Sequence, residues 1–306
     1  MLLMIGMSAR ASFRAQVKER PKIDLFPQFL ALWEQKDIGS SEVRASRFLE
    51  LVVEPHRNLY DAFVGTISIE RAIRYIEKVD PLVPVIKSLH GWVADDFHQR
   101  LTSFQQKLPG FELRSSVVFM PTLFGFDAGG GSVNGTDFLI FGLDTIAKID
   151  GLHADPSVLI AHELFHGYQA SFHPEWSGKE RGKNIPLYKL VWGEGIATYA
   201  SQQLNPGASE MAIFRSSTLV ASCKARLRSL ASLLLEELDD TGKTPFMEWM
   251  SGQSRSFDVP PRAGYYFGWR VAAELGRSRS LTELARLDDD YVKMAMSHSL
   301  QSLKTG

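Results

Sequence analysis

Apolar residues in the first third of the chain recur at helical spacing. Between Ile23 and about Phe111 they fall three or four positions apart, and prolines interrupt the pattern at intervals. From Leu113 to about Leu143 short runs rich in Val, Ile and Phe replace this spacing, with Gly129-Gly130-Gly131 and Asn134-Gly135 between them. We therefore expect several helices, followed by two or more strands joined by glycine-rich turns.

The chain returns to helical spacing from Pro156 to its end. We expect breaks near residues 177–183, at Asn205-Pro206-Gly207, near residues 239–243 and at Pro260-Pro261. This succession predicts an α+β fold that is mostly helical, with a small β-sheet preceding the helix that begins at Pro156.

The domain organisation follows from the same pattern. We expect an N-terminal extension over residues 1–20 and a single domain over residues 21–306. A helical front lobe with the sheet would occupy residues 21–151, and a helical back lobe would occupy residues 152–306, with the active-site cleft at the seam.

Composition excludes several functional classes. The 306 residues include 34 basic and 35 acidic side chains, so no global charge attracts the protein to nucleic acid. The single cysteine, Cys223, excludes an intramolecular disulfide and a cysteine-built zinc site. No apolar run approaches the roughly 20 residues that span a bilayer, and the apolar start lacks a basic leading region. We therefore expect no transmembrane segment and a cytoplasmic location.

The chemically informative stretch is HELFH, from His162 to His166. Two histidines four positions apart lie on one face of a helix, so both imidazoles can bind a single ion. Glu163 between them lies close enough to activate a metal-bound water. Asp155 as N-cap and Pro156 at the first helical position support the helix that this geometry requires.

A catalytic zinc site needs a third protein ligand, and two downstream residues are candidates. His173 lies seven residues after His166 on the same helix, about 10 Å along its axis and too far to share one ion. Glu194 lies on a second helix and is the better candidate. We therefore interpret His162, His166 and Glu194 as the metal ligands.

The second helix, expected from about Pro186 to Leu204, contains Glu194 in the sequence WGEGIATYA. Two glycines inside a helix each cost roughly 1 kcal/mol relative to alanine, so they indicate a packing requirement. We expect a stripe formed by Gly193, Ala197 and Ala200 to let this helix approach the histidine helix closely.

HELFH and WGEGIATYA together resemble the gluzincin metallopeptidases, in which a glutamate on the next helix completes the HExxH site. The sequence GYYFGWR, from Gly264 to Arg270, is similar to the Gly-Tyr-x-x-Gly signature of a family of predicted zinc-dependent proteases in that group. The resemblance extends from about Val117 to the end of the chain. It implies a zincin-like metallopeptidase domain with Zn²⁺ as cofactor, Glu163 as general base, and the ligands His162, His166 and Glu194.

The resemblance implies further details. Tyr265, or Tyr266 beside it, would donate a hydrogen bond to the oxyanion, and packing in an aromatic cluster is the alternative for both. An edge strand upstream of the metal helix would pair with extended substrate, and Phe138 to Leu143 is the candidate. Where some relatives place an acidic residue that fixes a histidine tautomer, this chain has Thr198.

The predicted function is zinc-dependent hydrolysis of a peptide or protein substrate. Glu163 would take a proton from the attacking water and return it to the leaving amine. One alternative is a peptide-binding module that keeps the zinc fold with little or no catalysis, although the intact Glu163 argues against it. Another is a zinc hydrolase of esters or non-peptide amides. No feature of the sequence indicates an oligomeric state.

Overall fold

The computed structural model describes residues 22–34, 39–151, 155–174, 185–251 and 258–305. The expected extension over residues 1–20 and the expected break near residues 177–183 lie outside these ranges. The described part is mostly helical with one mixed sheet of four strands, so the prediction of an α+β fold is confirmed at that level. No helix in these ranges is long and apolar enough to cross a membrane.

The N-terminal half combines the sheet with helical elements, most of them short. Helices α2 (Ser41–Phe48) and α4 (Ile69–Val79) begin after serine N-caps, whose hydroxyls accept a hydrogen bond from a backbone N–H of the first turn. The buried residues of α4 recur at helical spacing and form one apolar face. The helical elements are α1 (Phe26–Ala31), α2 (Ser41–Phe48), η1 (Leu49–Val53), η2 (Glu54–His56), α3 (Arg57–Phe63), α4 (Ile69–Val79), η3 (Asp80–Leu82), α5 (Val83–Lys107) and α6 (Leu143–Asp150).

The sheet has the strand order β1-β2-β4-β3. Its strands are β1 (Ile23–Asp24), β2 (Ser116–Phe119), β3 (Ala128–Val133) and β4 (Thr136–Phe141). β2 runs parallel to both β1 and β4, whereas β3 and β4 form an antiparallel hairpin. The hairpin turn is Asn134-Gly135, where φ is positive at both residues (50° and 78°), as a tight two-residue turn requires.

The predicted edge strand is wrong. β4 lies between β2 and β3, so both of its edges are paired, and Leu143 already begins α6. The apolar run from Phe138 to Phe141 is buried throughout, which is typical of a strand covered on both faces. Gly129-Gly130-Gly131, expected as a turn, lies inside β3. β3 is therefore the edge of the sheet on this side.

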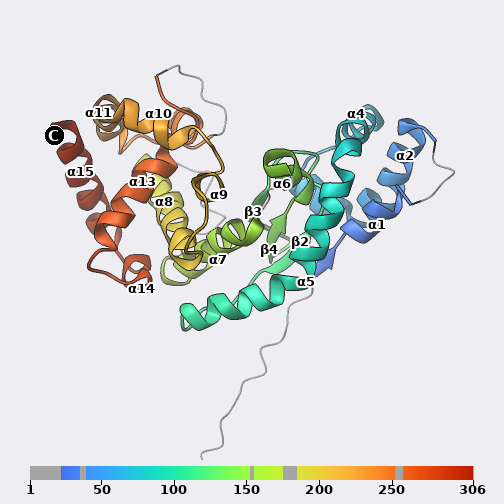
Figure 1. The fold of residues 1–306 in the computed structure, drawn as a ribbon, viewed down its shortest axis with the longest axis horizontal. Coiled ribbons are helices and arrows are strands. Elements are labelled where there is room, and N and C mark those ends of the chain that lie inside the picture. The colour runs from blue at the N-terminus through green and yellow to red at the C-terminus, as the bar shows by residue number, and fades with distance from the viewer. Residues whose placement is uncertain (1–21, 35–38, 152–154, 175–184, 252–257, 306) are drawn as a thin grey trace, which may run out of the picture.

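α7 (Pro156–Phe172) connects the two halves of the molecule (Figure 1). The sheet, α1 to α4 and α6 lie on one side of it, and most of the later helices lie on the other. α5 runs past α7 toward the later helices, where Lys107 at its end donates to the Leu204 carbonyl oxygen at 2.9 Å. Helices end just before two of the predicted breaks, Asn205-Pro206-Gly207 and residues 239–243, and a helix begins just after the third, Pro260-Pro261. The later helices are α8 (Leu187–Leu204), α9 (Glu210–Phe214), α10 (Leu219–Ala225), α11 (Leu227–Glu237), α12 (Lys243–Trp249), α13 (Ala263–Leu275), α14 (Leu281–Ala285) and α15 (Asp289–Thr305).

α8 and α13 approach each other most closely at two glycines. A methyl group built on Gly268 would lie 2.8 Å from the Cα of Gly195 and 2.9 Å from the carbonyl carbon of Val191, so a side chain has no room there. The expected role of Gly193 is wrong, because no heavy atom lies within 4 Å of the position its Cβ would take. The packing requirement in WGEGIATYA belongs to Gly195, and the partner helix is α13.

Candidate metal centre

α7 forms where the sequence predicts it. The Asp155 side chain accepts a hydrogen bond from the backbone N–H of Ser157 at 2.9 Å, and Pro156 opens the helix. Most of the helix is buried, and His162 itself is only 9% exposed. Because the helix is packed on several sides, the direction of its two histidines is well defined.

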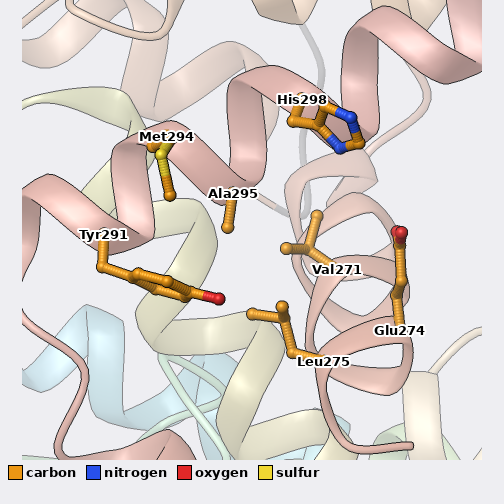
Figure 2. Close-up of a pocket in the computed structure, with 7 residues that line it drawn as sticks. All are labelled: Val271, Glu274, Leu275, Tyr291, Met294, Ala295 and His298. Carbon is orange, nitrogen blue, oxygen red and sulfur yellow. The ribbon is translucent and has the colours of Figure 1, made fainter.

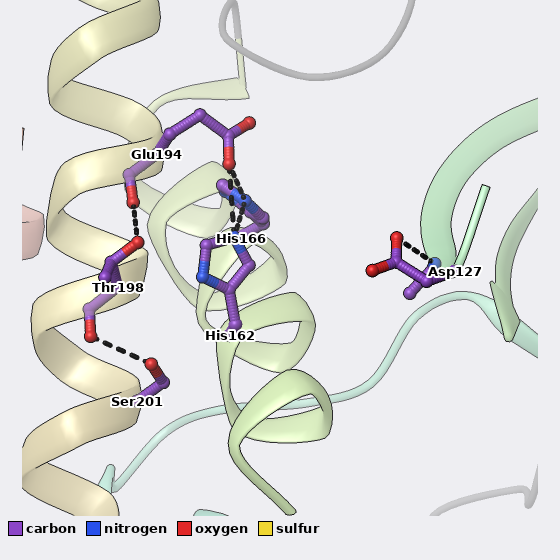
Figure 3. Close-up of polar contacts among 7 residues, drawn as sticks. Asp127, His162, His166, Glu194, Thr198 and Ser201 are labelled. Carbon is purple, nitrogen blue, oxygen red and sulfur yellow. Dashed lines mark hydrogen bonds and ion pairs between the residues drawn. The ribbon is translucent and has the colours of Figure 1, made fainter. Parts of the chain in front are cut away.

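Three side chains converge where α7 meets α8 (Figure 3). Oε2 of Glu194 lies 3.1 Å from Nε2 of His162 and 3.3 Å from Nε2 of His166, and the two Nε2 atoms lie 3.1 Å apart. Ligand atoms in a regular tetrahedral site with bonds of about 2.0–2.1 Å lie roughly 3.3 Å from one another. The observed triangle therefore fits three ligands of a zinc ion.

The charge state of these groups also suits a metal. Burial alone would raise the pKa of the Glu194 carboxyl, but His166 and His162 hold that pKa well below its usual range. The carboxylate is therefore ionised, and two imidazole nitrogens face the same oxygen. Three electron-pair donors this close to one another need a cation or shared protons between them.

Thr198, the position where some gluzincins carry an acidic residue, contacts the helix backbone. Its hydroxyl donates to the Glu194 carbonyl oxygen at 2.7 Å, one turn earlier on α8 (Figure 3). Within the described ranges, neither His162 nor His166 has a hydrogen-bond partner at Nδ1. The threonine therefore does not replace the acidic residue as a partner for a histidine.

A pocket opens on the three ligand side chains and brings together all the predicted site residues. Glu163 and Tyr265 line it beside His162, His166 and Glu194. The Tyr265 ring lies 6.3 Å from the His162 ring and almost parallel to it, with 18° between their planes. Burial, followed by the negative charge of Glu194, raises the pKa of Tyr265 above its usual value. Its hydroxyl stays protonated and can donate a hydrogen bond.

Tyr266 has a different environment. It is fully buried, and its ring centroid lies 5.5 Å from that of Phe267 and 6.1 Å from that of Trp269. Arg270 donates to its hydroxyl at 3.2 Å. The alternative of aromatic core packing therefore applies to Tyr266, whereas Tyr265 faces the pocket. His173 forms the C-cap of α7 and is not part of the three-residue cluster.

Arg215, which no sequence pattern indicated, connects the two lobes. Arg215 follows α9 in a left-handed conformation with φ of 54°, and its side chain is 6% exposed. It forms ion pairs with Asp127, just before β3, at 3.0 Å and with Asp150 at the end of α6. Burial raises the pKa of Asp150, and the positive charge of Arg215 opposes that rise. Arg215 and Asp127 both line the pocket.

Arg262, also missed, lines the pocket from the start of α13. It too is left-handed, with φ of 63° and ψ of 23°, and its guanidinium carbon lies 4.1 Å from the centroid of the Tyr265 ring. Because Arg262 precedes the helix in a left-handed conformation, helical spacing in the sequence did not indicate it.

A second pocket lies between α13 and α15 (Figure 2). Two of its polar groups already have partners, because Ser299 donates to Glu274 at 2.9 Å and Arg279 donates to the Tyr291 hydroxyl at 2.6 Å. The remaining lining is mainly apolar, and the three-residue metal cluster lies elsewhere. The lining residues are Val271, Glu274, Leu275, Tyr291, Met294, Ala295 and His298.

Comparisons of the chain with protein-family models, with curated proteins and with solved structures find no significant match. The chemistry of the site is therefore the basis for assigning a function.

Proposed function

We propose that this protein is a zinc-dependent peptide hydrolase of the gluzincin type. The observation that carries the proposal is one pocket lined by three convergent metal-ligand side chains, the Glu163 carboxylate and the Tyr265 hydroxyl. The order of elements agrees with a zincin-like domain, since a small sheet precedes α7 and the helix that follows it in the described ranges, α8, carries Glu194.

Each residue has a chemical task in this proposal. Zinc held by His162, His166 and Glu194 would supply Lewis-acid chemistry, polarising the scissile carbonyl and making water acidic near neutral pH. Glu163 takes the proton from the attacking water and returns it to the leaving amine. Tyr265, protonated because of its raised pKa, donates a hydrogen bond to the developing oxyanion.

The edge strand favours a peptide over a small ester or amide as substrate. Ala128 and Gly129 of β3 line the pocket beside the metal ligands. An extended peptide can add to such an edge through main-chain hydrogen bonds. The run Gly129-Gly130-Gly131 carries no side chains that would keep a second backbone away. β3, rather than β4, is the strand that takes this role.

Metal content tests the ligand set. We expect about one zinc per chain in the wild type by elemental mass spectrometry, and much less in Glu194→Ala. Gln203→Ala, which alters an exposed residue of the same helix, should retain the metal. Wild-type protein that holds no zinc after zinc is supplied would contradict the proposal.

Turnover of a fluorogenic peptide library tests the base. Glu163→Gln should keep its zinc and lose roughly 10²- to 10⁴-fold in rate, because the proton acceptor is gone. Glu210→Gln, the same change at an exposed position that opens α9, serves as the control. Retained hydrolysis in the Glu163 variant would refute the assignment. Zinc-loaded wild type that binds library peptides without cleaving them would favour a binding module.

A further inference from the structure

Arg262 holds a positive charge in the pocket despite an unfavourable setting. Its left-handed backbone is one that glycine or asparagine adopts with less strain. It also lies at the N-terminal end of α13, where the helix dipole disfavours a cation. Starting a helix needs neither an arginine nor a cation at this position. The arginine at this position therefore indicates a role for the charged side chain itself.

The charge of Arg262 is not balanced by a carboxylate of the described chain. Its side-chain contact there is the face of the Tyr265 ring, at 4.1 Å. Three carboxylates line the pocket with it: Asp127 pairs with Arg215, Glu194 contacts both histidines, and Glu163 is the proposed general base. Arg215, which lines the same pocket, lies between two carboxylates. Of the two pocket arginines, Arg262 is the one whose charge no carboxylate of the described residues matches.

The guanidinium lies close to the reacting centre. It is 4.1 Å from the Tyr265 ring centroid, and that ring is 6.3 Å from the ring of His162. An extended peptide advances roughly 3.3–3.6 Å per residue. The charge therefore lies no more than about three residues, along an extended peptide, from a bond held at the histidines.

We propose that Arg262 binds a carboxylate of the substrate, so that the enzyme selects peptides with an acidic group within three residues of the scissile bond. The inference rests on the proposed peptidase function. A planar guanidinium can donate two parallel hydrogen bonds to a carboxylate, a geometry that an ammonium group does not reproduce. An aspartate or glutamate side chain and the C-terminus of a peptide present the same pair of oxygens.

Peptide binding tests the proposal without turnover. Zinc-loaded Glu163→Gln protein is titrated into fluorescein-labelled hexapeptides of alanine and leucine, in which one glutamate is stepped along the chain. Each peptide has a glutamine counterpart, and each is made with a free and an amidated C-terminus. Fluorescence anisotropy should show the matching acidic peptides binding roughly 10- to 100-fold more tightly than neutral ones. A preference that follows the glutamate identifies a side-chain ligand, and one that follows the free terminus identifies the terminal carboxylate.

Variants in the same Glu163→Gln background link the preference to the residue. Arg262→Gln should abolish it and leave the affinity for neutral peptides within about twofold, whereas Arg262→Lys should restore part of it. Arg277→Gln, the same change at an exposed arginine just beyond α13, should keep the full preference. Equal binding of acidic and neutral peptides, or a preference that survives Arg262→Gln, overturns the proposal.

The inference and the function on which it rests fail in different ways. If acidic peptides bind through Arg262 but zinc-loaded wild type cleaves none of them, the carboxylate site stands and the hydrolase proposal fails. If wild type cleaves acidic and neutral peptides with equal kcat/KM, the hydrolase proposal stands and the carboxylate site is refuted.

Discussion

Replacing Gly195 with alanine should destabilise the protein, whereas the same replacement at Gly193 should stabilise it. Both residues lie inside α8, so each alanine gains about 1 kcal/mol of helix propensity. No heavy atom lies within 4 Å of the Cβ that Gly193 would acquire, so that gain is not offset. A methyl group on Gly195 would lie 2.6 Å from the backbone nitrogen of Trp269 and closer still to the backbone of Gly268.

The size of the effect follows from what the methyl group meets. Non-bonded heavy atoms normally approach to about 3.5–4.0 Å, so the overlap at Gly195 is close to 1 Å. The atoms that it meets belong to the backbone of α13 and cannot rotate away, so the two helices must separate. Such overpacking costs typically 1–3 kcal/mol and sometimes more. Because the propensity gain is common to both variants, their free energies of unfolding should differ by about the cost of overpacking at Gly195.

Urea unfolding of the two variants and the wild type, with equal slopes in the three transitions, measures this difference. The separation of α8 from α13 should also move Tyr265 relative to Glu194, so Gly195→Ala should lower kcat beyond any change in zinc content. A Gly195→Ala variant as stable as Gly193→Ala would refute the reasoning. It would mean that the close contact between the helices is not present in the folded protein.

Two further substitutions test the charged and aromatic groups of the pocket. Arg215→Met leaves the buried Asp150 without its counter-charge, which should cost about 3–5 kcal/mol at pH 7. The pKa of Asp150, already raised by burial, should then rise further above its unfolded value of about 3.9, so the folded variant binds the proton more tightly than the unfolded chain. The difference in free energy of unfolding between wild type and Arg215→Met, measured with urea, should therefore shrink from pH 7 toward pH 4. A difference that does not depend on pH would contradict this account. Tyr265→Phe should keep zinc, by elemental analysis, and lose roughly 10²-fold in kcat with little change in KM, whereas unchanged kcat would leave Tyr265 a packing role only.

The sequence predicted the parts of the site that a single helix holds. The spacing of His162 and His166, with Asp155 and Pro156 ahead of them, depends only on helical geometry, and α7 begins at the expected residue. The second helix, expected from about Pro186 to Leu204, is observed from Leu187 to Leu204. In these segments the local signals and the tertiary packing favour the same structure.

The errors concern positions that depend on distant segments. The run Gly129-Gly130-Gly131 favours a turn in the sequence, but glycine is also tolerated in an edge strand that another backbone can approach, and the run lies in β3. The apolar run of β4 indicated a strand but not its place in the sheet. Arg215 and Arg262 adopt left-handed conformations, which are uncommon for arginine and leave no periodic pattern in a sequence.

The glycines of GYYFGWR and the tyrosine between them have one geometric explanation. Gly264 and Gly268 lie about one turn apart on α13. Gly268 meets the backbone of Val191 and Gly195 on α8, whereas Gly264 lies against Met250 and Trp249 and touches α8 only through the Val191 side chain. Tyr265 follows Gly264 by one residue and therefore projects about 100° away from that contact, into the pocket. Glu194 precedes Gly195 by one residue on α8, so its side chain also projects about 100° away from the glycine contact and into the pocket. The glycine contact thus sets the distance between the third ligand and the tyrosine, although neither glycine lines the pocket.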